Sequence, residues 1–165
     1  MIAPRLKGAL LLKLIQAESM EQVALARLLI REYADSLGVD LCFQDFEKEL
    51  AGLPGDYAPP DGRLYLAFVG EQPAGCVGLR KIAGGASEMK RLYVRPLFRG
   101  QGVGRQLVLT LIKDARELGY SRMLLDTLPS MKRALELYRA MGFKPIEPYR
   151  ANPVPGAKFL ELKLL

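Results

Sequence analysis

The fold is decided by residues 92–105, LYVRPLFRGQGVGR. In this stretch a strand breaks at a proline, and three alternate glycines lead into a helix. Glycine lets backbone N–H groups approach a ligand closely, and the N-terminus of a helix carries partial positive charge. Arg99 and Arg105 add full positive charges at the two ends of the glycine run. The combination is typical of a loop that binds a pyrophosphate.

Two familiar phosphate-binding motifs do not fit this stretch. A Walker loop needs Gly-Lys-Ser/Thr after its glycines, and no such tripeptide follows. A dinucleotide fingerprint needs a third glycine where this chain has Arg105. On the glycines alone, a loop that merely turns the chain stays open as an alternative.

Basic residues gather around the same loop. The net charge is +6, and residues 62–165 hold 18 basic against 8 acidic side chains. Residues 90–105 contain five basic residues and no acidic one: Lys90, Arg91, Arg95, Arg99 and Arg105. A phosphorylated cofactor or a nucleic acid could use this charge. The run has only Tyr93 and Phe98 as aromatic residues for stacking on bases, so we expect no nucleic-acid partner.

Composition restricts the chemistry further. The 165 residues fit one domain, with 50% hydrophobic and 25% charged residues. The chain has no histidine, which excludes a Ser-His-Asp hydrolase. Its two cysteines, Cys42 and Cys76, lie in apolar runs without a metal-ligand spacing, so we expect neither a zinc site nor a cysteine nucleophile. Acid-base work then falls to Asp, Glu, Tyr, Lys or Cys.

The apolar stretch Ala9–Ile15 is the one candidate for a targeting or membrane segment. It is interrupted by Lys13, is too short for a membrane span and has no small-residue cleavage site after it. We therefore expect a cytoplasmic protein without a membrane partner. The sequence leaves open whether the chain forms a homodimer.

Apolar periodicity and turn residues divide the rest of the chain into helices and strands. Three strands from Leu64 to Val94, joined by short turns, predict an antiparallel meander. The Pro- and Gly-rich segment Gly52–Gly62 predicts a surface loop. The expected helices are 19–37, 43–52, 102–119 and 131–141, and the expected strands are 9–15, 64–69, 74–82, 87–94, 123–125, 143–146 and 158–164.

Two motifs carry a specific resemblance. Residues 99–104, RGQGVG, resemble the Arg/Gln-x-x-Gly-x-Gly/Ala signature of the GNAT superfamily of N-acetyltransferases. Residues 134–143, ALELYRAMGF, are similar to the Ala-x-x-Leu-Tyr-x-x-x-Gly-Phe helix end of the same family. The two occur in the family's order and at a plausible spacing. The resemblance covers about residues 64–164.

The resemblance implies an α/β fold, with a mixed, mostly antiparallel central sheet of about six or seven strands and about four helices. A bulge near Val94 would split the sheet, and acetyl-coenzyme A would lie in the cleft against the Leu124–Thr127 strand. The chain would be one domain, 1–165. Residues 1–62 would supply the first strand and the acceptor-side helices, and residues 63–165 the acetyl-coenzyme A-binding core.

The same resemblance implies which residues bind and which react. Acetyl-coenzyme A would be the donor, with no metal. The expected donor-binding residues are Leu92, Tyr93, Val94, Arg99, Gly100, Gln101, Gly102, Val103, Gly104 and Arg105. Glu88 resembles the family's general base, acting through water, although a charged strand end paired with a neighbouring cation explains it as well. Tyr138 resembles the proton donor to the thiolate, with core packing as the alternative. The Val94 N–H would hold the thioester carbonyl.

One position departs from the family. Many members have an asparagine seven residues before the tyrosine, and this chain has Met131 there. The amine acceptor is not identified by the sequence. Acidic residues in the first sixty hint at a cationic acceptor, although a solvated helix face explains them equally. A catalytically silent acyl-coenzyme A-binding module, which would need neither Glu88 nor Tyr138, stays open as the alternative function.

Overall fold

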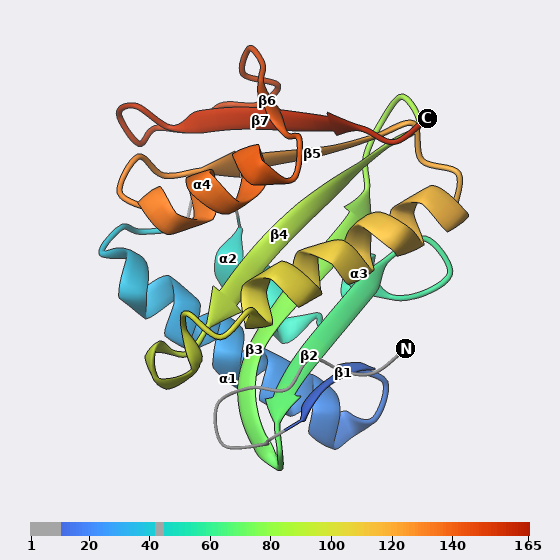
Figure 1. Ribbon diagram of the computed structural model, residues 1–165, viewed down its shortest axis with the longest axis vertical. Coiled ribbons are helices and arrows are strands. Elements are labelled where there is room, and N and C mark those ends of the chain that lie inside the picture. The colour runs from blue at the N-terminus through green and yellow to red at the C-terminus, as the bar shows by residue number, and fades with distance from the viewer. Residues whose placement is uncertain (1–10, 42–44) are drawn as a thin grey trace.

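The computed structural model describes residues 11–41 and 45–165, which form a seven-stranded sheet with helices on both faces (Figure 1). The strand order is β1-β2-β3-β4-β5-β7-β6, and every neighbouring pair is antiparallel except β4 and β5. The expected mixed, mostly antiparallel sheet is confirmed. The strands are β1 (Leu12–Gln16), β2 (Arg63–Val69), β3 (Gln72–Lys81), β4 (Ala86–Val94), β5 (Arg122–Thr127), β6 (Lys144–Pro145) and β7 (Lys158–Lys163).

Local signals account for the helix ends. Helix α1 (Met20–Leu37) begins with a capping box, in which the Ser19 hydroxyl accepts from the Gln22 N–H at 3.1 Å and the Gln22 side chain accepts from the Ser19 N–H at 3.0 Å. It ends at Gly38, whose φ of +67° is left-handed. The other helices are α2 (Phe46–Ala51), α3 (Val103–Glu117) and α4 (Lys132–Ala140). No helix in the described ranges is both long and apolar enough to cross a bilayer.

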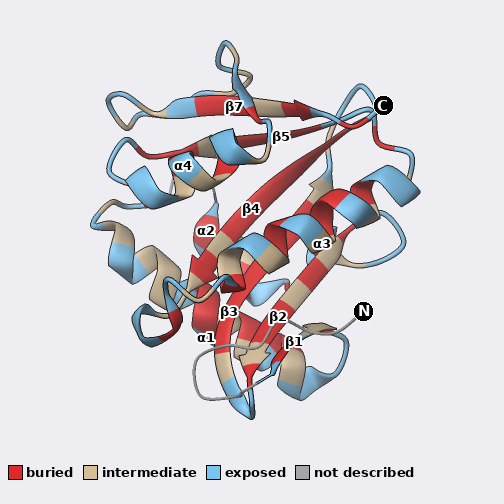
Figure 2. Cartoon of the chain, viewed as in Figure 1, coloured by how far each residue is buried: buried red, intermediate tan, exposed pale blue. Residues whose placement is uncertain are grey.

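The helices divide the core into two layers. Helices α3 and α4 lie against one face of the sheet, whereas α1 and α2 lie against the other (Figures 1 and 2). The fully buried side chains of α3 share a cluster with strand residues such as Val77 and Met123. On the other face, α1 buries Ala26, Leu29 and Ile30. Burial of both faces explains why β2 and β3 are apolar over most of their length.

The Gly52–Gly62 loop lies on the surface, as expected, and Tyr57 anchors it to the sheet. Tyr57 is 2% exposed, and its ring packs against Gly78 of β3. A Cβ on Gly78 would lie 2.8 Å from that ring, so the close approach requires glycine. The Tyr57 hydroxyl donates to Glu49 Oε1 of α2 at 3.0 Å. The expected start of the second helix at Phe43, like Cys42 and Ala9, lies outside the described residues.

An irregularity in β4 opens the sheet at its centre. Cys76 of β3 pairs with Tyr93, whereas Gly78 pairs with Lys90, so β4 has one extra residue between these pairs. Arg91 lies in this bulge with a φ of +62°. Strands β4 and β5 pair only from Ala86 to Glu88 on β4. Beyond Glu88 the two strands are no longer bonded to each other, and the site lies in that opening.

Candidate active site

A cleft of about 770 Å³ occupies the opening between the end of β4 and helix α4. It contains nine of the ten expected donor-binding residues: Leu92, Tyr93, Val94, Arg99, Gly100, Gly102, Val103, Gly104 and Arg105. Gln101 does not line the cleft, because its side chain turns back and donates to the Leu97 carbonyl at 3.3 Å. With Phe98, ten of the fourteen residues 92–105 therefore face one cavity.

The glycine loop is shaped for an anion. Gly100 and Gly102 have φ values of +77° and +84°, which side chains rarely adopt, and α3 begins immediately after Gly102. Arg99 Nε donates to the Val94 carbonyl at 2.8 Å and ties the loop to the end of β4. The exposed Arg105 follows in the first turn of α3. Backbone N–H groups at a helix N-terminus together with these arginines suit phosphate oxygens.

Helix α4 adds part of the cleft wall that the phosphate motif did not indicate. Ser130, Lys132 and Arg133 line the cleft at the start of α4, with Ala134 and Leu137 behind them. The two basic side chains are exposed and lie across the cleft from the glycine loop. The available sequence signal was the adjacent pair Lys132-Arg133 just before the second family motif.

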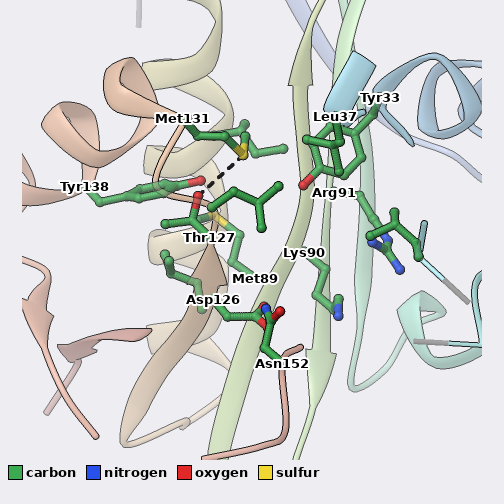
Figure 3. Close-up of a pocket in the computed structure, with 14 residues that line it drawn as sticks. Tyr33, Leu37, Met89, Lys90, Arg91, Asp126, Thr127, Met131, Tyr138 and Asn152 are labelled. Atoms are coloured by element: carbon green, nitrogen blue, oxygen red, sulfur yellow. Dashed lines mark hydrogen bonds between the residues drawn. The ribbon is translucent and has the colours of Figure 1, made fainter. Parts of the chain in front are cut away.

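A second, smaller cavity of about 40 Å³ adjoins the cleft. Tyr33, Leu37, Leu92 and Met131 line both, so they mark the junction. The polar wall of the small cavity is formed by Lys90, Asp126 and Asn152, which Figure 3 shows together with Arg91 and Tyr138. None of Asp126, Asn152 or Tyr33 was a candidate from the sequence, because each comes from a different element.

The bulge explains why Lys90 and Arg91 both belong to this cavity. Four consecutive residues, 89–92, line it, which the alternation of a regular strand would not allow. Arg91 is almost fully buried and donates from Nε to Glu49 Oε2 at 2.9 Å. Lys90 is 6% exposed. Burial and the neighbouring Arg91 charge lower the pKa of Lys90 from 10.5 to about 8.

Tyr138 reaches the small cavity from α4. It is 4% exposed, and its ring packs against Phe143 at a centroid distance of 5.6 Å. Burial raises the pKa of its hydroxyl well above the ordinary value. Met131 caps the same helix at the junction of the two cavities, and the Thr127 hydroxyl donates to its sulfur at 3.5 Å. Methionine here therefore keeps one weak polar contact.

Glu88 precedes Met89 of the small cavity on β4 but lines neither cavity. Its side chain is fully buried and accepts hydrogen bonds from Arg80 Nε at 2.8 Å, from the Tyr149 hydroxyl at 2.6 Å and from Arg150. The Arg150 guanidinium also lies 5.1 Å from the centre of the Tyr149 ring. The structure thus places Glu88 among two cations and a hydroxyl, in the paired arrangement that buried carboxylates require.

Comparison with known proteins decides the family. The model of the acetyltransferase (GNAT) family matches residues 24–143, which include the glycine loop and the Tyr138 motif. The chain belongs to the GNAT family. An uncharacterized N-acetyltransferase of Schizosaccharomyces pombe is 42% identical over 140 residues, covering 84% of this chain and 86% of that protein. The chain is accordingly an N-acetyltransferase.

Solved structures agree with the GNAT fold. A GNAT acetyltransferase from Staphylococcus aureus has a TM-score of 0.78 at 19% identity and covers 93% of this chain and 99% of that one. PaiA N-acetyltransferase from Thermoplasma acidophilum, solved in complex with coenzyme A, has a TM-score of 0.71 at 18% identity over 92% of this chain and 98% of that one. At these low identities the similarity shows a shared fold and nothing about the substrate.

An acyl-coenzyme A fits the cleft of this GNAT enzyme. The positive-φ glycines and Arg105 suit a pyrophosphate, and the basic start of α4 adds charge on the opposite side. The apolar Leu92, Val94 and Leu137 suit the aliphatic parts of the pantetheine arm. The residues present therefore match the chemistry of the family's acyl donor along the length of the cleft.

Proposed function

We propose that this enzyme transfers the acetyl group of acetyl-coenzyme A to a primary amine of a small molecule or peptide, by direct attack in a ternary complex. The observation that carries the proposal is the junction of the two cavities at Tyr33, Leu37, Leu92 and Met131. A donor in the cleft and an amine in the small cavity would meet there. Holding both reactants together removes much of the entropic part of the barrier.

The reaction requires two proton movements. The amine nitrogen bonds to the thioester carbon, the carbon–sulfur bond breaks with its electrons on sulfur, one proton leaves nitrogen and one reaches sulfur. In this proposal the Tyr138 hydroxyl supplies the proton to sulfur, and the Val94 N–H holds the carbonyl oxygen. The position of Tyr138 in the small cavity and its raised pKa support a hydroxyl that is protonated when the thiolate forms.

Glu88 stays the proposed general base. Its burial and its three donors keep the carboxylate from direct contact with an acceptor in the small cavity, so in this proposal the proton reaches it through water. The alternative from the sequence, a charged strand residue paired with neighbouring cations, predicts the ion pairs with Arg80 and Arg150 equally well. A variant of Glu88 separates the two interpretations, as described in the Discussion.

A covalent acetyl-cysteine route has no support in the geometry of Cys76. The side chain is completely buried, and Sγ donates to the Arg91 carbonyl at 3.4 Å. Burial raises the pKa of this thiol to about 12, so it is not a thiolate at neutral pH. Direct attack needs no such nucleophile.

The experiment that tests the proposal measures thiol release from acetyl-coenzyme A with a panel of amines, amino acids, polyamines and peptides. A ternary mechanism gives initial-rate lines that intersect when donor and acceptor are varied together, whereas a covalent intermediate gives parallel lines. Tight binding of acetyl-coenzyme A without thiol release across the panel would instead favour the silent acyl-coenzyme A-binding module.

A further inference from the structure

Two carboxylates lie close to the opening between β4 and β5, and they differ sharply in surroundings. Glu88 pairs in register with Leu124, so Asp126 lies two residues further along β5 toward the cleft. The Glu88 side chain is fully buried and carries hydrogen bonds from three residues. Asp126 is partly exposed and lines the small cavity. Of the two, Asp126 is the carboxylate that an incoming molecule meets.

A neighbouring amide holds Asp126 in place. Asn152 Nδ2 donates to Asp126 Oδ2 at 3.3 Å. The other end of the amide is occupied, because Asn152 Oδ1 accepts from the Val154 N–H at 3.0 Å. With its oxygen bound to that N–H, the amide must present nitrogen to Asp126. Among residues 11–41 and 45–165, this is the one hydrogen bond to the Asp126 carboxylate, which therefore has room for further donors.

We propose that Asp126, positioned by Asn152, binds the ammonium group of the acceptor, and that the acceptor is a primary amine on an unbranched carbon. The proposal rests on the proposed function and names the substrate class of its acceptor cavity. A carboxylate and an ammonium group form charge-assisted hydrogen bonds, which are stronger than neutral ones. The amine carried by Asp126 would lie in the cavity that adjoins the donor cleft at Met131 and Leu92.

The size of the cavity sets the shape of the acceptor. Its volume is about 40 Å³, far smaller than the adjoining cleft of about 770 Å³. The space therefore suits a small group, such as an ammonium and the carbons next to it. The apolar part of the wall includes Tyr33, Leu125 and Tyr138. A substituent on the first carbon would meet this wall, so the acceptor enters through a narrow arm.

The other charged groups of the cavity do not oppose a cationic ligand with full strength. Arg91 is neutralised by both oxygens of Glu49, at 2.9 and 3.3 Å. Burial lowers the pKa of Lys90 to about 8, so its charge declines through the mildly alkaline range. In that range unbranched alkylamines are still largely protonated. Ammonium binding to Asp126 should therefore strengthen from pH 7 to 9.

The test measures binding of n-butylamine to the coenzyme A complex of the enzyme by calorimetry, together with KM and kcat for the same amine. Asp126→Asn keeps the size of the side chain and removes its charge. We expect it to weaken amine binding and raise KM by about 10- to 100-fold, with coenzyme A affinity unchanged. Asn152→Ala should weaken binding by a smaller factor. Glu71→Gln, an exposed loss of the same charge, serves as the control.

Two outcomes would overturn the inference. One is n-butylamine binding within twofold of wild type in Asp126→Asn, and the other is equal binding of n-butylamine and the α-branched sec-butylamine by wild type. Because both are binding measurements, they are independent of turnover. Failure of the proposed function has a different signature, in which n-butylamine binds to the coenzyme A complex through Asp126 but acetyl-coenzyme A releases no thiol.

Discussion

The Glu49 carboxylate of α2 accepts hydrogen bonds from both Nε and Nη2 of Arg91, the residue at which β4 bulges. The Arg91 side chain is 3% exposed and also lies over the Phe46 ring at 5.2 Å. One buried ion pair thus connects helix α2 to the bulge of β4. Removing the carboxylate would leave a buried, unpaired guanidinium, which strongly destabilises the folded state.

Glu49→Gln should therefore destabilise the protein by about 3–5 kcal/mol, the usual cost of removing one partner from a buried pair. Urea denaturation followed by circular dichroism measures the change. Glu47→Gln is the matched control on the same helix, because its pair with Arg31 is exposed, and its midpoint should equal that of wild type. Equal midpoints for the two variants would contradict a structural role of the Glu49–Arg91 pair.

Charge reversal beside the glycine loop should weaken binding of the phosphate end of coenzyme A without affecting binding of its pantetheine end. Arg105→Glu is expected to weaken coenzyme A binding by about 10- to 100-fold, because a charge-assisted contact is replaced by repulsion. Affinity for pantetheine, which lacks the phosphates, should stay the same. Arg116→Glu makes the same charge change on an exposed residue near the other end of α3 and should leave both affinities unaltered.

Tyr138→Phe removes one hydroxyl with little loss of packing. If Tyr138 protonates the departing sulfur, kcat should fall by about 10²–10⁴-fold while coenzyme A binding persists. Burial keeps the pKa of the tyrosine above the ordinary range, so the loss should be the same from pH 6 to 9.5. Tyr120→Phe, the same change at a tyrosine that donates to the Asp61 carbonyl, is the control. If Tyr138→Phe has the kcat of wild type, the role of Tyr138 is packing and not proton donation.

Glu88→Gln distinguishes a base from a structural ion-pair partner. A base acting through water predicts that the variant loses most rate below the pKa of the amine and recovers part of it as pH rises, because neutral amine then becomes available. A carboxylate that only neutralises Arg80 and Arg150 predicts lower stability with no such pH pattern. Reaction rates from pH 6 to 9.5, together with thermal unfolding of the same variant, decide between the two roles of Glu88.

Lys90 should make stability depend on pH. In the unfolded chain a lysine keeps its proton to about pH 10.5, whereas in the folded protein Lys90 loses it from about pH 8. The unfolded state therefore binds more protons between these values, and stability from this group rises with pH. Lys90→Met removes the effect.

The measurable quantity is the difference in unfolding free energy between Lys90→Met and wild type. From pH 7 to 9.5 the unfolding free energy of wild type should rise by on the order of 2 kcal/mol relative to that of Lys90→Met. Lys113→Met, at an exposed position of α3, should give a constant difference over the same range. A constant difference for Lys90→Met as well would mean that Lys90 titrates as an ordinary lysine.

The sequence by itself determined the parts of this protein that local chemistry specifies. The capping box at Ser19, the glycine end at Gly38 and the strand-to-glycine-to-helix stretch 92–105 act through neighbouring residues, so their structure follows from their order. Both family motifs contribute residues to one cleft, and nine of the ten expected residues line it. Gln101 points away from the cleft because its side chain donates a hydrogen bond to the Leu97 carbonyl, and residue spacing does not predict this contact.

Only the tertiary structure decided which distant side chains share the small cavity. Tyr33, Asp126 and Asn152 lie on three elements far apart in the chain, and packing rather than sequence spacing brings them together. The same holds for Glu88, which local pattern identified as a charged strand residue but whose partners Arg80, Tyr149 and Arg150 come from another strand and a late loop. Burial and the surroundings of a charge are properties of the folded chain, because they depend on what every other element excludes from water.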